Sequence, residues 1–466
     1  MPDLAVKDDT PAALSRAVHH ALRYLADLDT AAVGATATME SLRQRLLKPL
    51  GDGPLPAEQV IDDLVSDAAG GIIGCAGGRF YAWVMGGSMP ASLAADWLTS
   101  AWDQNAGLYA SGPAAALVEE AAGAWLKDLL NIPAEASFAL VTGCQMAHVT
   151  CLAAARGAVL LAKGWDVNEN GLSGGPAIRV LCGADSHGVT AHGSTTRALR
   201  LLGMGKSQPV QLNADALEAA LSTEPDRPTI LLLQAGELNT GVYDPFAELI
   251  PIAKKYHAWV HIDGAFGLWA AANAKLRHLL DGAERADSWA TDGHKWLNVP
   301  YDSGYAFVRD TAAHRASMSY RASYLIHDTE ARDQIDWTPE WSRRARGFAT
   351  YAALRQLGRS GVSELVERCC RHAKELVMGI GGLPGAEVMW EPQINQGLVR
   401  FLDPAGTDHD ARTDEVIAKI VASGEAFFGG CTWRGVRCMR VSVCNWRTSQ
   451  RDVERVIAAV GALLAV

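Results

Sequence analysis

The sequence predicts an α/β protein whose mostly parallel sheet is covered by helices on both faces. Short apolar runs that favour strands alternate with helical stretches between residues 137 and 310, which is the pattern of repeated strand–helix units. Turn residues follow the strand-like runs at the ends where open α/β sheets bind ligands. The 45 glycines in 466 residues suit the many tight strand-to-helix loops of such a fold.

The composition argues against several classes of protein. The chain is 49% hydrophobic and 20% charged, which are ordinary values for a soluble enzyme. Its net charge of −10 argues against a nucleic-acid or anionic-membrane binder. Neither a signal-peptide pattern nor an uncharged apolar stretch of about eighteen residues is visible, so no membrane span is expected. The nine cysteines have no CxxC pair and no metal-like spacing, so we expect reduced thiols, no bound metal and a cytoplasmic protein.

The N-terminal segment is predicted to be a helical arm. Apolar residues recur at helical spacing through residues 11–50, and Pro49 and Gly51 close that segment. A second amphipathic helix is expected over residues 57–70. Helical arms of this kind often pack on a partner subunit, and we take residues 1–75 as such an arm.

The first strand-like run leads into a turn that favours anions. Residues 137–143 predict a strand and a turn, and a helix begins at Cys144. The free amide N–H groups and the dipole of a helix N-terminus bind anions such as phosphate. A phosphate held by the amides near Cys144 and Gln145 fits this pattern, although every strand–helix unit has a similar turn.

Two further strand ends carry polar side chains. Residues 178–182 predict a strand, and His187 and His192 follow it near the start of a helix. Either histidine can stack on a flat ring, or be a solvated residue at a helix start. Residues 229–234 predict another strand, and the loop after it contains Asn239, again at the end of a strand where ligands bind.

An acid and a lysine on neighbouring strand ends point to pyridoxal phosphate (PLP). The apolar run at residues 258–262 delivers Asp263 at its end, and Lys295 follows the next strand-like run at residues 287–291. A lysine forms a Schiff base with PLP, and a carboxylate keeps the pyridine nitrogen protonated so that the ring accepts electrons. Either residue alone would favour a structural role; the pair in this setting favours the cofactor.

The C-terminal part is predicted to form a smaller α+β domain. Two helices are expected over residues 347–382, and later helices over 411–423 and 450–465. Strand-like runs alternate with these later helices, in the order strand, strand, helix, strand, helix. We divide the chain into an arm at residues 1–75, a large cofactor domain at 76–340 and a small domain at 341–466.

Three motifs carry a family resemblance: HIDGAFG, DGHKWLNVPYDSG and WSRRARG. Over most of residues 76–466 the chain resembles the group II PLP-dependent decarboxylases, which act on aromatic L-amino acids, glutamate and histidine. The family has HVDAA where this chain has HIDGA, and NPHKW where it has DGHKW. The resemblance implies a type I PLP fold and a homodimer with active sites at the subunit interface.

The resemblance also implies the site residues. Lys295 is the expected Schiff-base lysine, Asp263 the partner of the ring nitrogen and His192 the histidine stacked on the ring, and these three are the expected catalytic residues. The expected cofactor-binding residues are Cys144, Gln145, His192, Asn239, Asp263, Ala265, His294 and Lys295. His192 is favoured because His192-Gly193-Ser194 and the following Arg197-Ala198 match without a gap, whereas His187 matches if distance from the preceding strand decides.

Two departures from the family concern the phosphate. Family members commonly offer small hydroxyl residues there, but Cys144, Gln145 and Met146 fill the turn in this chain. Backbone amides can still bind the phosphate. Asp292 stands where many members have asparagine, and a carboxylate beside a phosphate dianion is repelled unless it points away.

A third departure concerns the proton that replaces the lost carboxylate. Many animal and plant members carry a tyrosine three residues before a tryptophan, and counting back from Trp337 gives Gln334. Glutamine is not an acid of useful pKa, so another donor is needed. The candidates are Tyr320, Tyr324, His294, His192 and Lys295.

The sequence therefore predicts a PLP-dependent decarboxylase of an L-amino acid, with aromatic substrates as one option, that releases CO₂ and an amine. Gln334 leaves open oxidative deamination to an aldehyde or transamination. Transamination requires an arginine for the substrate carboxylate, and Arg440 is a candidate. A non-catalytic family member is the third alternative, and the intact Asp263, His294 and Lys295 argue against it.

Overall fold

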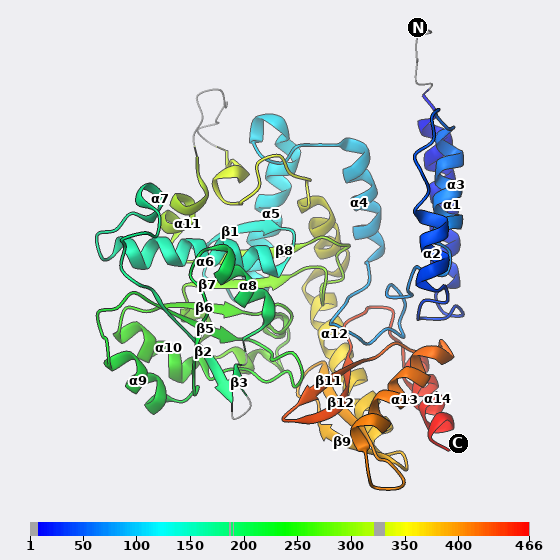
Figure 1. Cartoon of the computed structure of the whole chain (residues 1–466). Coiled ribbons are helices and arrows are strands. Elements are labelled where there is room, and N and C mark those ends of the chain that lie inside the picture. Colours follow the sequence, from blue (N-terminus) through cyan, green and yellow to red (C-terminus); the bar gives the residue numbers. More distant parts are fainter. Residues whose placement is uncertain (1–7, 186–187, 190, 321–330, 466) are drawn as a thin grey trace.

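The core of the molecule is a twisted sheet with helices on both faces (Figure 1). The computed structural model describes residues 8–185, 188–189, 191–320 and 331–465. The strands are β1 (Ser137–Val141), β2 (Arg179–Asp185), β3 (Gly188–Val189), β4 (Gln208–Val210), β5 (Thr229–Gln234), β6 (Trp259–Asp263), β7 (Ser288–Asp292) and β8 (Gly304–Val308). Their order is β1-β8-β7-β6-β5-β2-β3, and β4 pairs with β2. Strands β2, β4, β5, β6 and β7 pair in parallel, which confirms the predicted α/β fold, while β8 is antiparallel to both of its neighbours.

The alternation of side chains along each strand explains why both faces of the sheet are covered. In β5, Ile230 and Leu232 join one apolar cluster, whereas Leu231 and Leu233 join another. Successive side chains of a strand point to opposite faces, so an uninterrupted apolar run needs helices on both sides. The run at Thr229–Gln234 is apolar throughout its centre, as a buried parallel strand requires.

Helices of the large domain are divided between the two faces. They are α4 (Pro90–Trp102), α5 (Pro113–Leu129), α6 (Cys144–Leu161), α7 (Val167–Asn170), α8 (Gly193–Leu201), α9 (Ala214–Ser222), α10 (Phe246–Lys255) and α11 (Thr311–Met318), with short 3₁₀ helices at Tyr109–Ser111, Gly267–Ala272, Arg277–Leu280, Ala283–Arg285 and Gln334–Asp336. Residues of α6 and α8 pack on the face that contains Ile230, and residues of α5 and α10 pack on the other.

Helix α6 is the central helix of one face. Of the helices in the described residues, it is the one long and apolar enough to cross a membrane by length and composition. However, 61% of it is buried inside the fold. It contacts β1, β5, β6, β7 and β8. Its apolar character is therefore accounted for by its packing on the sheet.

A small antiparallel sheet forms the C-terminal domain. Its elements are β9 (Ala386–Trp390), β10 (Gln396–Phe401), α13 (His409–Ser423), β11 (Gly429–Trp433), β12 (Val436–Ser442) and α14 (Gln450–Leu464), with strand order β11-β12-β10-β9. The sequence suggested one strand where β11 and β12 form a hairpin. Its two-residue turn, Arg434 and Gly435, has positive φ at both positions, the geometry that matches the twist of antiparallel strands.

Helix α12 (Gly347–Gly381) joins the two domains. Gly358 interrupts it with φ 61° and ψ −178°, so the two helices predicted over this stretch are confirmed as two segments in direct succession. Glycine at residue 358 adopts this positive φ with little strain, because it has no Cβ.

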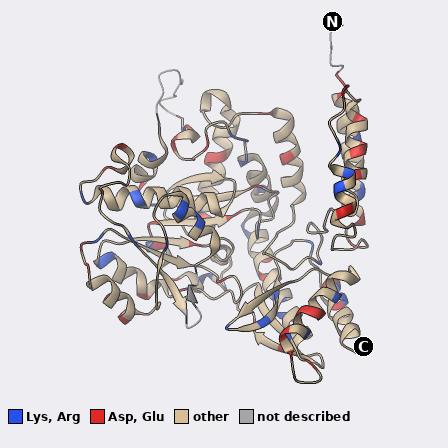
Figure 2. Ribbon diagram, in the orientation of Figure 1, with Lys and Arg blue, Asp and Glu red and all other residues tan. Residues whose placement is uncertain are grey.

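The N-terminal arm lies beside the body of the molecule (Figure 1). It contains α1 (Thr10–Asp27), α2 (Met39–Leu46) and α3 (Ala57–Ala68). Acidic and basic residues both lie on the arm (Figure 2), although the charged residues of α3 are all acidic. The prediction of one continuous helical segment was wrong between α1 and α2. There the chain turns to pack on the small domain: the N–H of Val33 donates to the carbonyl of Gly424, and Thr38 begins the next helix as its N-cap.

Candidate active site

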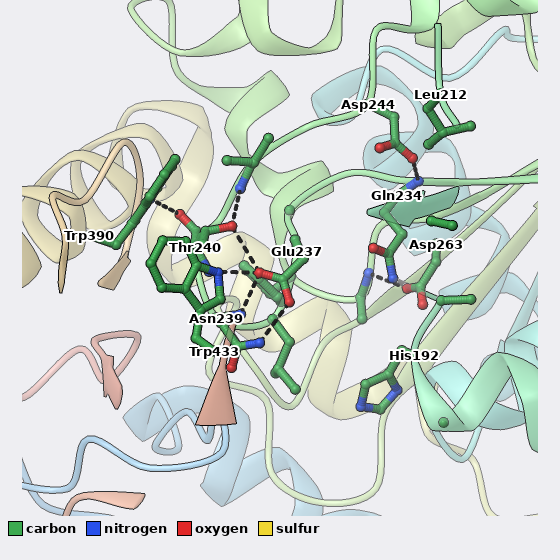
Figure 3. Close-up of a pocket in the computed structure, with 18 of the residues that line it drawn as sticks. His192, Leu212, Gln234, Glu237, Asn239, Thr240, Asp244, Asp263, Trp390 and Trp433 are labelled. Atoms are coloured by element: carbon green, nitrogen blue, oxygen red, sulfur yellow. Dashed lines mark hydrogen bonds between the residues drawn. The ribbon is translucent and has the colours of Figure 1, made fainter. Parts of the chain in front are cut away.

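A cavity of about 670 Å³ opens at the carboxyl ends of β5 and β6. Its walls come from the strand ends, the loop after β5, the start of α8 and the small domain. They include His192, Asn239, Asp263, Ala265 and Lys295, five of the residues expected from the sequence. Figure 3 shows His192 and Asp263 on one side of the cavity and Trp390 and Trp433 on the other.

Asp263 is a buried carboxylate at the end of β6. Its Oδ1 accepts the N–H of Ala265 at 3.1 Å and its Oδ2 accepts the hydroxyl of Thr195 at 3.2 Å. The Nε2 atom of His148 lies 3.4 Å from Oδ2. Burial opposes ionisation, but the charge and hydrogen bond of His148 and the charges of His192 and Lys295 hold the pKa of Asp263 well below its usual range. The site therefore keeps an anion that can pair with a protonated ring nitrogen.

Lys295 follows β7 and reaches the same cavity. Its Nζ lies 3.1 Å from Oδ2 of Asp292. Burial alone would lower the pKa of Lys295, but Asp292, with Cys144 and Asp263, raises it. The loop before α4 packs closely against the backbone of Lys295. A Cβ at Gly86 would lie 2.0 Å from the Lys295 carbonyl oxygen. This close approach explains why residue 86 is glycine.

The turn predicted to bind phosphate contacts Asp292. The backbone N–H of Cys144 donates to Oδ1 of Asp292 at 2.6 Å, so this carboxylate points toward the turn. His294 lies against the same turn, with Nε2 3.4 Å from Oδ1 of Asp292. Within the described parts of the chain, the N–H groups of Gln145 and Met146 have no acceptor, and they stay available for an anion.

His192 and Asn239 lie on the cavity wall with partners of their own. His192 is the N-cap of α8, and its Nδ1 accepts the N–H of Ser194 at 3.2 Å. Burial lowers the pKa of His192, against the charge of Asp263, which raises it. The side-chain amide of Asn239 donates to Oε1 of Glu237 at 2.9 Å, which leaves its second N–H for a ligand. His187, the alternative to His192, lies outside the described residues.

These residues fit pyridoxal phosphate. Asp263 is an acceptor-only anion that suits a cationic ring N–H, and Lys295 offers an amine in the same cavity. His192 supplies a flat ring on the wall, and the unpaired amides after Cys144 suit a phosphate. Phosphate bound there would lie near the Asp292 carboxylate, which is the unfavourable feature of the site.

The comparisons with known proteins decide the family. Residues 40–402 match the model of the pyridoxal-dependent decarboxylase conserved domain. The chain belongs to this family. Pyridoxal phosphate is therefore its cofactor, and the enzyme is a PLP-dependent amino-acid decarboxylase, a carboxy-lyase.

Individual relatives are distant in sequence and close in fold. The decarboxylase is 24% identical to the aromatic-L-amino-acid decarboxylase of Bacillus atrophaeus, over 96% of this chain and 94% of the relative. It is 25% identical to the 4-hydroxyphenylacetaldehyde synthase of Rhodiola rosea, over 85% of this chain and 83% of the relative. The solved structure of Oryza sativa TDC with PLP and tryptamine is 23% identical, with a TM-score of 0.89 over 100% of this chain and 99% of that one. This likeness confirms the predicted fold.

Gln334 does not line the decarboxylase cavity. It is buried, its Nε2 donates to the carbonyl of Ala116 at 3.3 Å, and its Oε1 accepts from Arg332 at 2.7 Å. Among the alternative proton donors, Tyr320 is 70% exposed and lies beside Trp341. Tyr324 lies outside the described residues.

The WSRRARG motif is structural in the decarboxylase. Arg343 is buried, donates to Glu119 at 2.8 Å and to the carbonyl of Leu140 at 2.7 Å. The two neighbouring arginines of the motif form more exposed ion pairs with Asp96 and Asp302. Arg440, considered for a substrate carboxylate, is 7% exposed and does not line the cavity in the described chain.

Several cavity and support residues were missed from the sequence. Glu237 lies in the predicted loop and organises it by accepting hydrogen bonds from Asn239 and Thr240. Trp390 and Trp433 come from the small domain, and no sequence spacing links them to the sheet. The contacts of His148 and Thr195 with Asp263 were also missed. The spacing of His148 four residues after Cys144, on one face of a helix, was the available signal.

Proposed function

We propose that the decarboxylase acts on an aromatic L-amino acid and releases the corresponding amine with CO₂. The observation that carries this proposal is the aromatic wall opposite Asp263. Trp390 and Trp433 lie there edge to face, with ring centroids 5.7 Å apart, and Phe266 adds a further ring. Aromatic rings pack well against such a wall in offset or edge-to-face geometry. The name of the Bacillus atrophaeus relative supports the same substrate class.

The residues of the chain divide the chemistry among them. When bound, PLP supplies the electron sink for the carbon that loses its carboxylate. The Lys295 amine would hold the cofactor covalently, and Asp263 would be the anion that pairs with the ring nitrogen. His192 closes one side of the cavity with its ring. These groups are fixed before the substrate arrives, so they stabilise the developing charge without reorganisation.

Lys295 is the group we favour for returning a proton to the substrate carbon. Among the candidate donors, Lys295 and His192 lie on the cavity wall. The pKa of Lys295 is raised by Asp292, despite its burial, so the amine carries a proton at neutral pH. Burial lowers the pKa of His192, which makes it mostly neutral there.

A second candidate outcome is an aldehyde. Gln334 replaces the tyrosine of many relatives, and it is bonded elsewhere in the fold. Two similar proteins are named as aldehyde synthases, from Rhodiola rosea and Petunia hybrida. Loss of the carbon-directed proton donor favours oxidation of the decarboxylated substrate by dissolved dioxygen. With one water consumed, this reaction would release an aldehyde, ammonia and hydrogen peroxide.

One experiment separates the two outcomes. The PLP-loaded protein is incubated with a panel of L-amino acids, and CO₂, amine, aldehyde and peroxide are measured together. We expect one amine per CO₂, and faster reaction with aromatic substrates than with glutamate or 2,4-diaminobutyrate. Aldehyde and peroxide in place of amine would establish the second outcome.

We further propose that the enzyme works as a homodimer in the cytoplasm. Apolar side chains on the arm and on α4 are exposed in the single chain: Leu22, Leu47, Leu64, Trp97, Leu98 and Trp102. Contiguous exposed apolar surface marks protein interfaces. The nine cysteines are free, which suits a reducing compartment. Light scattering on the full chain tests the dimer, and fractionation of cells tests the compartment; a monomer or a secreted protein would contradict these proposals.

A further inference from the structure

A chain of buried polar side chains runs from the cavity wall into the protein behind it. His148 Nε2 lies 3.4 Å from Oδ2 of Asp263, and His148 Nδ1 lies 2.9 Å from Nε2 of His261. On its other side, His261 Nδ1 lies 2.9 Å from the hydroxyl of Ser288, which also accepts the indole N–H of Trp259 at 2.9 Å. Both histidines and Ser288 are fully buried.

The register of the strands places these groups together. Trp259, His261 and Asp263 alternate along β6, so all three project from one face of the sheet. Ser288 of β7 is directly opposite His261 in the parallel pairing. Helix α6 crosses this face and brings His148 onto it. A buried histidine pair at this depth is costly unless its nitrogens are paired, and the chain of contacts pairs them.

The donors and acceptors of the chain determine where the protons lie. The indole of Trp259 can only donate, so Ser288 accepts from it and has its own proton free for Nδ1 of His261. Burial and the neighbouring His148 lower the pKa of His261 to about 3, so this ring is neutral and carries its proton on Nε2. It then donates to Nδ1 of His148.

This arrangement leaves the proton of His148 on Nε2, toward Asp263. In the reverse arrangement, His261 donates to Ser288 and His148 donates to His261 through Nδ1. His148 Nε2 would then direct a lone pair at the Asp263 carboxylate, which is repulsive, and only the weak S–H donor of Cys144, 3.4 Å away, could pair with it. The first arrangement is therefore favoured, and it presents an Nε2–H group to Asp263.

We propose that His148 is a positioning residue that holds Asp263 as an anion facing the cofactor ring nitrogen, with the buried chain of His261, Ser288 and Trp259 fixing its orientation. This inference rests on the proposed function, because it concerns the carboxylate assigned to the cofactor. His148 does not line the cavity, so it acts through Asp263. Ionisation of Asp263 then depends on the helix behind the sheet as well as on the cavity.

Other titratable groups surround this row of buried side chains, and three side chains within it could act as metal ligands. The titratable neighbours of His148 and Asp263 are Cys144 on the same helix, His192 at the start of α8, Asp292 at the end of β7 and Lys295 after it. Ligand atoms of Cys144, His148 and Asp263 lie within 4.8 Å of one another. Three ligands are fewer than the four of a structural zinc site, and one nitrogen of His148 is already used by His261.

The test compares three variants of the full chain. His148→Leu removes the N–H group, His148→Gln keeps a side-chain amide donor, and His314→Leu is the matched control. His314 is also a fully buried histidine bonded at both nitrogens, to Ser137 and to the carbonyl of Trp337. For each, PLP affinity is measured by titration of the visible absorbance band, and the pH midpoint of that band and the melting temperature of the cofactor-free protein are measured in parallel.

We expect His148→Leu to weaken PLP binding about tenfold or more and to shift the pH midpoint upward. His148→Gln should recover most of the affinity, and His314→Leu should lower the melting temperature with neither spectral change. Unchanged affinity and midpoint in a folded His148→Leu protein would overturn the proposal, as would equal spectral changes in His314→Leu. Loss of PLP affinity in the wild-type protein on treatment with a metal chelator, restored by added zinc, would assign His148 to a metal site and overturn the proposal. The substrate panel above tests the proposed function independently, because cofactor titration needs no substrate.

Discussion

The Nζ atom of Lys295 lies 3.1 Å from Oδ2 of Asp292, and Oδ1 of the same carboxylate accepts the N–H of Cys144. One buried carboxylate thus joins Lys295, the lysine proposed to bind the cofactor, to the turn expected to hold the phosphate. It stabilises the charged lysine, and it places a negative charge beside the anion that the turn should bind. In the cofactor-free protein, Asp292 is therefore the shared partner of the Lys295 amine and of the turn.

Replacing this carboxylate should strengthen cofactor binding. In Asp292→Asn the amide oxygen can still accept the Cys144 N–H, while the repulsion from a phosphate dianion disappears. The pKa of Lys295 also falls, which favours the unprotonated amine needed for a Schiff base. We expect an affinity gain of about tenfold by spectral titration. The control is Asp226→Asn, since Asp226 is fully exposed. Weaker binding in Asp292→Asn alone would contradict this account of the site.

The close approach of the loop before α4 to Lys295 gives a second prediction. A Cβ at Gly86 would lie 2.0 Å from the Lys295 carbonyl oxygen, whereas a Cβ at Gly157 in α6 meets nothing within 4 Å. Gly86→Ala should therefore displace Lys295 and abolish the visible cofactor band. Gly157→Ala should keep the band and add up to about 1 kcal/mol of stability, as expected inside a helix. A normal band in Gly86→Ala would show that the loop is not fixed against the lysine.

The buried ion pair of the WSRRARG motif should contribute to stability. Arg343→Met leaves Glu119 buried without its partner, which costs about 3–5 kcal/mol. Arg344→Met removes a more exposed pair with Asp96 and should cost about 1 kcal/mol or less. Urea unfolding of the cofactor-free protein measures both. Similar costs for the two variants would contradict the structural role of Arg343.

Gln334 should not be convertible into a proton donor by substitution. It is 1% exposed and hydrogen-bonded to the Ala116 carbonyl and to Arg332. Gln334→Tyr overfills this position, so we expect a loss of about 1–3 kcal/mol in stability. The ratio of amine to aldehyde should stay that of the wild type. A change in that ratio, measured with an aromatic L-amino acid, would place residue 334 in the catalytic site.

His314 is a buried neutral histidine, so the free energy of unfolding should depend on pH. Burial and the charge of Arg332 lower the pKa of His314 to about 3 from 6.5. Between these values the unfolded chain binds a proton that the folded chain does not, so stability rises with pH by about 1.4 kcal/mol per unit. In His314→Leu this contribution is absent. The destabilisation caused by His314→Leu should therefore be about 2 kcal/mol smaller at about pH 5 than at about pH 7, and an equal cost at both would contradict the neutral state.

The sequence predicted the parts of the site that lie at strand ends. Asp263, His192 and Lys295 line one cavity because parallel strands end at the same edge of the sheet. Ala265, expected from the family resemblance, lines it too. The rule uses only strand order and polarity, which apolar runs and turn residues reveal. It also located Asn239, although its hydrogen bond to Glu237 depends on the folded loop.

The parts that depend on packing between distant elements were not predicted. Trp390 and Trp433 reach the cavity only after the small domain docks. His148 meets Asp263 because α6 crosses the sheet at a particular angle, which helical periodicity does not give. The direction of Asp292 was left open, since it depends on the Lys295 side chain. Spacing placed Gln334 where many relatives have tyrosine, but it did not show that Gln334 is buried against α5.

The central claim is that the enzyme uses Lys295 and Asp263 to bind its cofactor and decarboxylates an amino acid to an amine. The most direct measurement is the stoichiometry of CO₂, amine and aldehyde formed from an aromatic L-amino acid. Wild type and Lys295→Ala are compared after incubation with the same concentration of PLP. We predict one amine for each CO₂ with wild type, and neither product nor the visible cofactor band with Lys295→Ala. Aldehyde with ammonia and peroxide from wild type, or turnover that survives in Lys295→Ala, would contradict the claim.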